Sequence, residues 1–260
     1  MKKTYDLKII KKEILNDEIF KIVLEMPEDM PEILPGQFFG LSVSDNGYPL
    51  LRRPISVSKV EDNSFELTIK VLGEGTLLLL KKEVNETINV LGPVGNGFFL
   101  DDMSENSIIV GGGIGVSPIK ELARVMKETL KKDIPVLLGF RDRPFDMDDF
   151  NEVSSDIEIA TESGVVGVKG YVTTLLEERL KSNKPEVVYV CGPHMMLKAV
   201  KELCERYDVP TQLLMEERMA CGIGACLVCT CAIKDGHEIT NKRVCKDGPV
   251  FYGSEVVFDV

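Results

Sequence analysis

The first hundred residues alternate short apolar runs with turn residues. Five such runs lie at residues 19–26, 37–44, 53–60, 65–73 and 87–95. Strands at this spacing are typical of a small antiparallel barrel. A group of glycines and one proline between Gly92 and Gly97 closes the pattern. We therefore expect an N-terminal antiparallel β-barrel domain over residues 1–100.

The period changes beyond residue 100. An apolar run at residues 107–113 predicts a buried strand, and apolar side chains at helical spacing predict a helix from Pro118 to about Leu130. Further strands are expected at residues 135–141, 157–162, 187–193 and 211–216, and further helices at 173–180 and 195–207. This alternation favours a parallel sheet with both faces covered. We expect an α/β nucleotide-binding domain over residues 101–214 and a small C-terminal module over 215–260, which is too short for a core of its own.

Composition and charge narrow the classes of partner. The chain has 31 basic and 42 acidic residues, so its formal net charge is −11, which disfavours binding to nucleic acid or to an anionic membrane. No apolar run approaches the length of about 20 residues that a membrane helix needs. The N-terminal residues show no export signal. The sequence predicts a soluble, cytoplasmic protein.

Seven cysteines provide the strongest chemical signal. An odd count without an export signal argues against a disulfide framework and favours metal or redox chemistry. Cys221, Cys226 and Cys229 are separated by four and then two residues, and fifteen residues lie between Cys229 and Cys245. This is the plant-type spacing for a [2Fe–2S] cluster. A zinc site is the alternative, although it usually takes two paired knuckles and the second half here supplies one cysteine.

The other three cysteines carry less information. Cys231 leaves the same loop on a strand, and we treat it as a neighbour of the cluster. Cys191 and Cys204, on a strand and on a helix face, have the pattern of small core residues.

A glycine-rich loop follows the strand at residues 107–113. A loop of this kind, where a strand ends and a helix begins, lets a pyrophosphate approach the backbone and the helix N-terminus. The loop 191–193, Cys-Gly-Pro, also ends a strand and opens a helix, so the two loops are expected to form two walls of one crevice. Asp142 is a candidate for binding the ribose, but Arg141 and Arg143 beside it leave NAD and NADP as alternatives.

A second anion site is expected in the barrel. Arg53 lies at the start of one predicted strand, and Gly75 and Thr76 lie where a helix begins. An arginine beside a helix N-terminus is suited to hold a pyrophosphate. Two solvated arginines and an ordinary N-cap threonine are the alternative.

These motifs together resemble the ferredoxin–NADP reductase superfamily. Arg53–Ser56 match its R-x-x-S element, Gly112–Pro118 its G-G-x-G-x-x-P element, and Cys191–Pro193 its C-G-P element. With the cysteine module placed last, nearly the whole chain resembles the electron-transfer subunits of type B dihydroorotate dehydrogenase. A related electron-bifurcating reductase subunit has an aspartate where this chain has Cys221, which favours the dihydroorotate family.

The resemblance implies a cofactor set and a residue for each role. FAD would be bound by Arg53, Pro54, Ile55, Ser56, Ile69, Lys70, Val71, Gly75 and Thr76. NAD, as a substrate, would be bound by Gly112, Gly113, Gly115, Ser117, Pro118, Cys191, Gly192 and Pro193. One [2Fe–2S] cluster would be bound by Cys221, Cys226, Cys229 and Cys245.

The resemblance also implies a partner subunit and a direction of electron transfer. An FMN-containing catalytic subunit, in an assembly of two plus two chains, would oxidise dihydroorotate in pyrimidine biosynthesis. Electrons would then pass through the cluster and FAD to NAD⁺, because a flavin exchanges both hydride and single electrons. No residue of this chain is expected to be catalytic. The alternatives are a reductase subunit linked to ferredoxin, sulfur or glutamate synthase, and a non-catalytic redox sensor.

Overall fold

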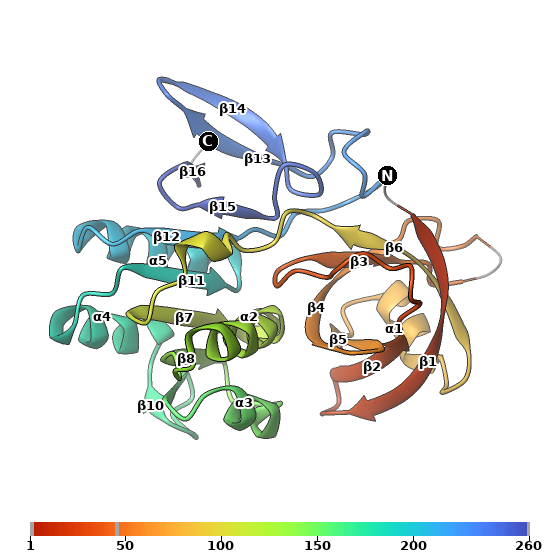
Figure 1. Ribbon diagram of the computed structural model, residues 1–260, viewed down its shortest axis with the longest axis horizontal. Helices are drawn as coiled ribbons and strands as arrows, with labels where there is room; N and C mark the ends of the chain where they lie inside the picture. The colour runs from red at the N-terminus through yellow and green to blue at the C-terminus, as the bar shows by residue number, and fades with distance from the viewer. Residues whose placement is uncertain (1–2, 45–46, 259–260) are drawn as a thin grey trace.

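The computed structural model describes residues 3–44 and 47–258. It divides into a closed barrel, a seven-stranded sheet flanked by helices, and a three-stranded sheet that lies above both in Figure 1. The predicted fold class is therefore confirmed. The boundaries 1–100, 101–214 and 215–260 stay a prediction.

The barrel has the strand order β1-β2-β5-β4-β3-β6, and all neighbouring strands are antiparallel. Its strands are β1 (Thr4–Ile14), β2 (Ile19–Glu25), β3 (Phe38–Leu41), β4 (Arg53–Glu61), β5 (Ser64–Lys70) and β6 (Thr87–Val94). Stacked rings of Phe39 and Phe65 form part of the interior. Helix α1 (Glu74–Lys81) lies between β5 and β6 in the sequence and contributes Leu79 to this core.

Strand β1 was not among the predicted runs, although the sequence carries a signal for it. Tyr5, Leu7 and Ile9 are buried and alternate with exposed polar residues. Alternation of this kind is the period of a half-buried strand. The lysines around this strand mask the signal, because they lower its mean hydropathy.

The nucleotide domain is built on a sheet of order β10-β9-β8-β7-β11-β12-β15. Its strands are β7 (Ser107–Gly112), β8 (Val136–Phe140), β9 (Ile157–Thr161), β10 (Val168–Lys169), β11 (Val187–Cys191), β12 (Thr211–Leu214) and β15 (Val250–Tyr252). All are parallel to their neighbours except β15, which pairs antiparallel with β12. This sheet sits beside the barrel in Figure 1.

Four helices cover the two faces of this sheet. The helices α2 (Val116–Leu130) and α3 (Met147–Val153) pack on one face, and α4 (Val172–Ser182) and α5 (His194–Arg206) pack on the other. Helix α2 begins two residues earlier than expected, and Pro118 lies in its first turn, where a missing N–H costs nothing. The short α3 was not predicted, because only Phe150 and Val153 are buried along it. Two single turns, η1 (Leu100–Asp102) and η2 (Gly113–Gly115), complete the domain.

The C-terminal module shares its core with the rest of the chain. Its own sheet has the order β14-β13-β16 and consists of β13 (Thr230–Asp235), β14 (Glu238–Arg243) and β16 (Val256–Val257). Buried residues such as Cys229 and Val244 belong to the same apolar cluster as the face of the nucleotide sheet that α4 and α5 cover. The Asn96 side chain donates to the Val250 carbonyl at 3.0 Å and accepts from the Val250 N–H at 3.2 Å, which ties the end of the barrel to β15.

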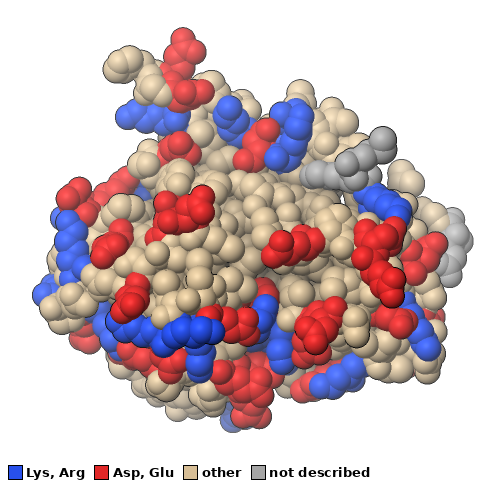
Figure 2. All heavy atoms as spheres, in the orientation of Figure 1, with Lys and Arg blue, Asp and Glu red and all other residues tan. Residues whose placement is uncertain are grey.

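Charged side chains of both signs lie on the surface. Figure 2 shows acidic and basic side chains interspersed on the visible face, with no large basic patch. Across residues 3–44 and 47–258, no helix is both long and apolar enough to cross a membrane.

Candidate functional site

The R-x-x-S element lies at the start of β4. Arg53, Pro54, Ile55 and Ser56 are all partly exposed, and they pair with β3 through a register that sets Ser56 opposite Phe38. The side chains of this element, on the wall of the barrel, therefore remain partly accessible to a ligand.

The Arg53 guanidinium lies over the N-terminus of α1. A Cβ added to Gly75 would overlap this guanidinium, so only glycine leaves room for it. The Thr76 hydroxyl accepts hydrogen bonds from the N–H groups of Leu72 and Gly73, which orders the turn before the helix. A guanidinium beside the positive end of a helix dipole is suited to a diphosphate. The residues present therefore fit the diphosphate of FAD.

Three other predicted flavin residues lie at the end of β5. Ile69 is fully buried inside the barrel, so a flavin contact at this position would come from its backbone. Lys70 pairs with Glu18 at 3.3 Å, and the Val71 N–H donates to the Glu18 carbonyl. The roles of these three residues stay predictions.

Replacing Gly75 with alanine is expected to weaken flavin binding. The added methyl group would displace the Arg53 guanidinium, and losing a charge-assisted hydrogen bond costs about 1.5–3 kcal/mol, which is about tenfold or more in affinity. Fluorescence titration of the flavin-depleted protein with FAD measures this effect. Gly73→Ala is the matched control, because nothing lies within 4 Å of its Cβ. Equal affinities in the two variants would contradict the assignment.

The two glycine-containing loops of the nucleotide domain touch each other. A Cβ on Gly115 would lie 2.7 Å from the backbone of Gly192 and 2.8 Å from that of Cys191. A Cβ on Gly112 would overlap the sulfur of Met196, which follows the second loop. The loops thus meet at the carboxyl ends of adjacent parallel strands β7 and β11, and the nucleotide crevice between them stays a prediction.

Ser117 carries a further mark of a ligand site. It lies in the first turn of α2 and is only 2% exposed, and its hydroxyl has no hydrogen-bond partner among the described residues. Buried hydroxyls are normally paired. A hydroxyl, backbone N–H groups of a glycine loop and a helix N-terminus together fit the polar groups of a dinucleotide. Arg141, Asp142 and Arg143 follow β8 and are all exposed, so NAD and NADP remain alternatives.

The four predicted metal ligands form two pairs. The Cys226 N–H donates to the Cys221 sulfur at 3.4 Å, and the Cys245 N–H donates to the Cys229 sulfur at 3.4 Å. Among the described residues, no three cysteine sulfurs lie within 4.8 Å of one another. Two pairs of thiolates suit two iron atoms, whereas one tetrahedral zinc ion needs four neighbouring sulfurs. The donor set therefore fits a [2Fe–2S] cluster.

The ionisation of these thiols follows from their surroundings. Burial opposes the Cys221 thiolate, but hydrogen bonds from the backbone N–H groups of Ile223 and Cys226 outweigh it and lower the pKa to about 6. Burial, and then the neighbouring Cys229, raise the pKa of Cys245 to about 12. A bound metal ion deprotonates such a thiol and compensates its buried charge.

Arg243 joins the two halves of the cysteine site. Its guanidinium donates to the Gly224 carbonyl at 3.0 Å and forms two hydrogen bonds with Asp247, at 2.8 Å and 3.0 Å. Gly224 has a φ of +82°, and a Cβ there would lie 2.6 Å from the Lys246 side chain. Sequence reasoning overlooked Arg243, because nothing in its local pattern distinguishes it from a solvated arginine on β14.

The remaining cysteines are buried. Cys231 lies beside the loop, and burial raises its pKa to about 12, as it does for Cys204 on α5. Burial also raises the pKa of Cys191. Cys191 nevertheless borders the contact between the two nucleotide loops, so a backbone role there is compatible with its buried thiol.

One cleft links the barrel to the cysteine loop. On the barrel side it is lined by Arg52, which precedes β4, and by residues of β3, β4 and β6 that include Gly40 and Pro54; on the other side it is lined by residues 219–222, which include Cys221. The predicted flavin strand and a predicted cluster ligand therefore lie on opposite sides of one small cleft.

Known families match two parts of this chain. Residues 216–257 match the iron–sulfur cluster binding domain of dihydroorotate dehydrogenase B, and residues 109–202 match the oxidoreductase NAD-binding domain. A chain from Clostridium acetobutylicum named "dihydroorotate dehydrogenase B (NAD(+)), electron transfer subunit" is 37% identical over 260 residues and covers 100% of both chains. The chain of the same name from Bacillus pumilus is 41% identical and covers 98% of each.

This chain belongs to that family.

Solved structures agree with the family assignment. The structure of an NADH-dependent reduced ferredoxin–NADP oxidoreductase has a TM-score of 0.85 and 28% identity, and covers 99% of this chain and 92% of its own. Phthalate dioxygenase reductase has a TM-score of 0.67 at 20% identity, with 90% and 87% covered, and shares the fold. Identity to the electron-transfer subunits of dihydroorotate dehydrogenase B is higher than to either. The predicted family is confirmed, and the chain is an oxidoreductase component.

Proposed function

We propose that this chain carries electrons to NAD⁺ from a partner subunit, and that this partner oxidises dihydroorotate. FAD and one [2Fe–2S] cluster are the resident cofactors of the chain. Dihydroorotate loses two electrons and two protons to become orotate. NAD⁺ takes up both electrons and one proton as hydride, and the second proton is released to water. The family assignment and the names of the relatives support this reaction.

The observation that carries the proposal is the shared cleft. Pro54, next to Arg53 on the flavin strand, and Cys221 of the cysteine loop line the same cleft. Electron transfer between two centres needs short separation, and the fold brings the two binding segments together from positions more than a hundred residues apart in the sequence.

The residues divide the work of binding. Arg53 and the N-terminus of α1 would hold the diphosphate of FAD, and the two cysteine pairs would hold the iron. The Gly112–Pro118 segment and Cys191–Pro193 would hold the dinucleotide. When bound, FAD supplies exchange of hydride with nicotinamide and of single electrons with an iron–sulfur cluster.

The proposed partner is an FMN-containing catalytic subunit, in an assembly of two plus two chains, and the proposed location is the cytoplasm. An exposed apolar surface around Cys226 supports docking near the cluster. Ile223, Leu227 and Val228 are about half exposed or more, and Cys226 between them is itself exposed. Exposed apolar side chains that gather in one place are typical of an interaction site.

Replacing Leu227 with aspartate is expected to weaken partner binding by about tenfold or more, because a charge would be buried in an apolar interface. Leu227 is 63% exposed and has a φ of +59°, a conformation that aspartate tolerates, so the fold should be kept. Co-purification and titration with the catalytic subunit measure the effect. Ile239→Asp, which changes an exposed side chain on β14, is the control. If Leu227→Asp bound the catalytic subunit with unchanged affinity, the partner would not dock on this surface.

The function itself is tested on the purified chain. We expect flavin and about two irons per chain, and rapid NADH-dependent reduction of an artificial acceptor. Colourless protein that contains zinc would refute the proposal. Protein that binds both cofactors but reduces no acceptor with NADH would instead favour a redox sensor.

A further inference from the structure

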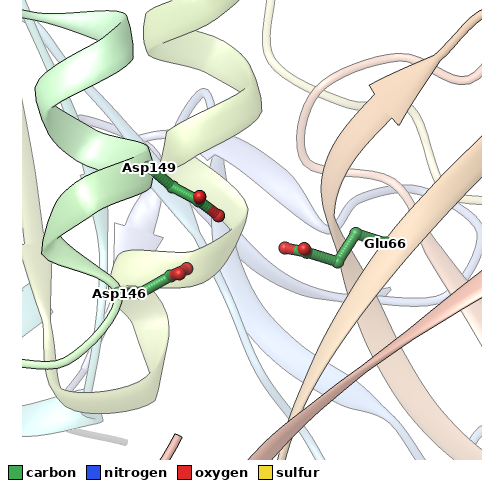
Figure 3. Close-up of side chains that lie close together, drawn as sticks. All are labelled: Glu66, Asp146 and Asp149. Atoms are coloured by element: carbon green, nitrogen blue, oxygen red, sulfur yellow. The ribbon is translucent and has the colours of Figure 1, made fainter. Parts of the chain in front are cut away.

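A largely buried group of five charged side chains lies between the barrel and the nucleotide domain. Lys21 of β2 and Glu66 of β5 come from the barrel. Lys120 of α2, together with Asp146 and Asp149 at the start of α3, comes from the nucleotide domain. Figure 3 shows the three carboxylates pointing toward one another from the two sides. We call these five residues the interdomain ion cluster.

Both lysines connect the two domains. The Lys120 ammonium lies 2.9 Å from Glu66 of the barrel, and 2.6 Å from Asp146 and 2.7 Å from Asp149 of its own domain. The Lys21 ammonium lies 2.7 Å from Asp149 and also pairs with Asp146, both across the interface. Each lysine therefore has a carboxylate partner in the opposite domain.

The ion cluster is largely shielded from water. The side chains of Lys120, Asp146 and Lys21 are 1%, 2% and 5% exposed, and those of Glu66 and Asp149 are 11% and 25% exposed. The three carboxylates lie close enough together to hold a metal ion, but the ammonium groups of the two lysines already form ion pairs with them. Ser58 of β4 donates to Glu66 at 2.9 Å, which fixes the barrel side.

Such contacts restrain sliding more strictly than apolar packing does. Displacing the two domains would leave buried charges without partners, which is much less favourable than shifting one aliphatic surface over another.

Helix α2 carries one member of the cluster, begins at the proposed nucleotide loop and also contacts the strand of the proposed flavin site. Helix α2 begins at the glycine loop, and Lys120 follows Pro118 by two residues. The next residue, Glu121, is 1% exposed and accepts a hydrogen bond at 2.9 Å from the N–H of Val60 on β4. Strand β4 starts at Arg53. One helix and one strand thus carry both the binding segments and the contacts that lock them together.

We propose that the interdomain ion cluster is a positioning device that fixes the orientation of the nucleotide domain on the flavin barrel. It holds the glycine loop against β4 so that a bound nicotinamide faces the flavin. This inference rests on the proposed function, since it assumes that hydride passes between these two groups. Reaction rates fall steeply when two reacting groups are misplaced by as little as 1 Å, so a loosened interface should slow hydride transfer more than it weakens binding.

Lys21→Met tests the proposal. It keeps the aliphatic stem but leaves Glu66 facing two aspartates with Lys120 as the remaining cation. Under anaerobic stopped-flow conditions, we expect the flavin reduction rate at saturating NADH to fall by about tenfold or more, with little change in NADH affinity or flavin content. Lys21→Arg, which keeps the charge, should restore the rate. Lys201→Met is the matched control, because Lys201 pairs with Glu205 inside α5, 2.6 Å away.

Hydrogen exchange at Val60 is the second readout and needs no turnover. The Val60 N–H donates a hydrogen bond across the interface to Glu121. Its protection from hydrogen exchange should therefore fall in Lys21→Met and stay unchanged in Lys201→Met. A lower melting temperature with an unchanged reduction rate and unchanged Val60 protection would show a purely structural role and overturn the proposal. If wild-type flavin is not reduced by NADH, the proposed function fails, and Val60 protection alone then decides on the positioning of the domains.

A double variant covers the case in which Lys21→Met does not fold. Lys21→Met/Glu66→Gln removes both barrel charges and leaves Lys120 paired with the aspartates of its own domain, so no charges repel across the interface. We expect it to fold, to reduce its flavin slowly and to lose Val60 protection. Wild-type rate and protection in this double variant would refute the proposal.

Discussion

Replacing Cys226 with serine is expected to abolish electron transfer to the partner while NADH still reduces the flavin at close to the wild-type rate. Cys226 is exposed, so the substitution removes a ligand without opening a cavity in the core. Its loss leaves one iron with Cys221 alone, and a serine hydroxyl is a poor substitute for a thiolate at this position. Iron content and visible absorbance measure the loss of the cluster. Anaerobic stopped-flow measures both the reduction of the flavin by NADH and the transfer of electrons to the partner.

Cys231→Ala is the control for this variant. Cys231 lies in the same segment but is assigned no iron, so about two irons per chain should remain after its replacement. A Cys226→Ser protein that passes electrons to the partner at the normal rate would show that the cluster is not on the path.

The second large effect is expected from Gly115→Ala. The backbone of Gly115 has φ −66° and ψ −6°, which alanine adopts freely, so the whole cost comes from the clash with the second loop. Separating Gly115 from Gly192 would open the crevice in which the dinucleotide is proposed to bind. We expect NADH-dependent flavin reduction to fall by about a hundredfold, while iron and flavin content are kept.

Gly236→Ala is the control for a general loss of stability. Gly236 has a φ of +63°, so alanine there costs roughly 1–2 kcal/mol of stability, but nothing lies within 4 Å of the added Cβ and the residue is outside the proposed nucleotide site. We expect a lower melting temperature with NADH reduction retained. Equal reduction rates in Gly115→Ala and the wild type would mean that the loop contact does not shape the nucleotide site.

Local sequence patterns predicted most of the fold. Alternation located β2 to β6, and the helical spacing of Ile119 and Leu122 located α2. The cysteine spacing is also local, because three of the four ligands lie on one loop. In these cases the residues that determine the structure are neighbours in the sequence, so a short window contains the information. The alternation of Tyr5, Leu7 and Ile9 is a local signal for β1 as well, but the surrounding lysines mask it.

Features that need several distant segments could not be predicted. The interdomain ion cluster draws on β2, β5, α2 and α3, and in the sequence its members look like ordinary surface charges within strands and helices. Strand β15 joins the nucleotide sheet because β12 leaves an edge open, and this depends on the complete sheet order. The pairing of Cys229 with Cys245 likewise requires the β13–β14 hairpin to bring them together.

The most direct test of the account is the paramagnetic resonance spectrum of the whole chain after anaerobic reduction with NADH. The account predicts the signal of a reduced [2Fe–2S] centre, together with bleaching of the flavin absorbance, in a sample that contains about two irons per chain. Flavin bleaching without any cluster signal, even after addition of a stronger chemical reductant, would contradict it.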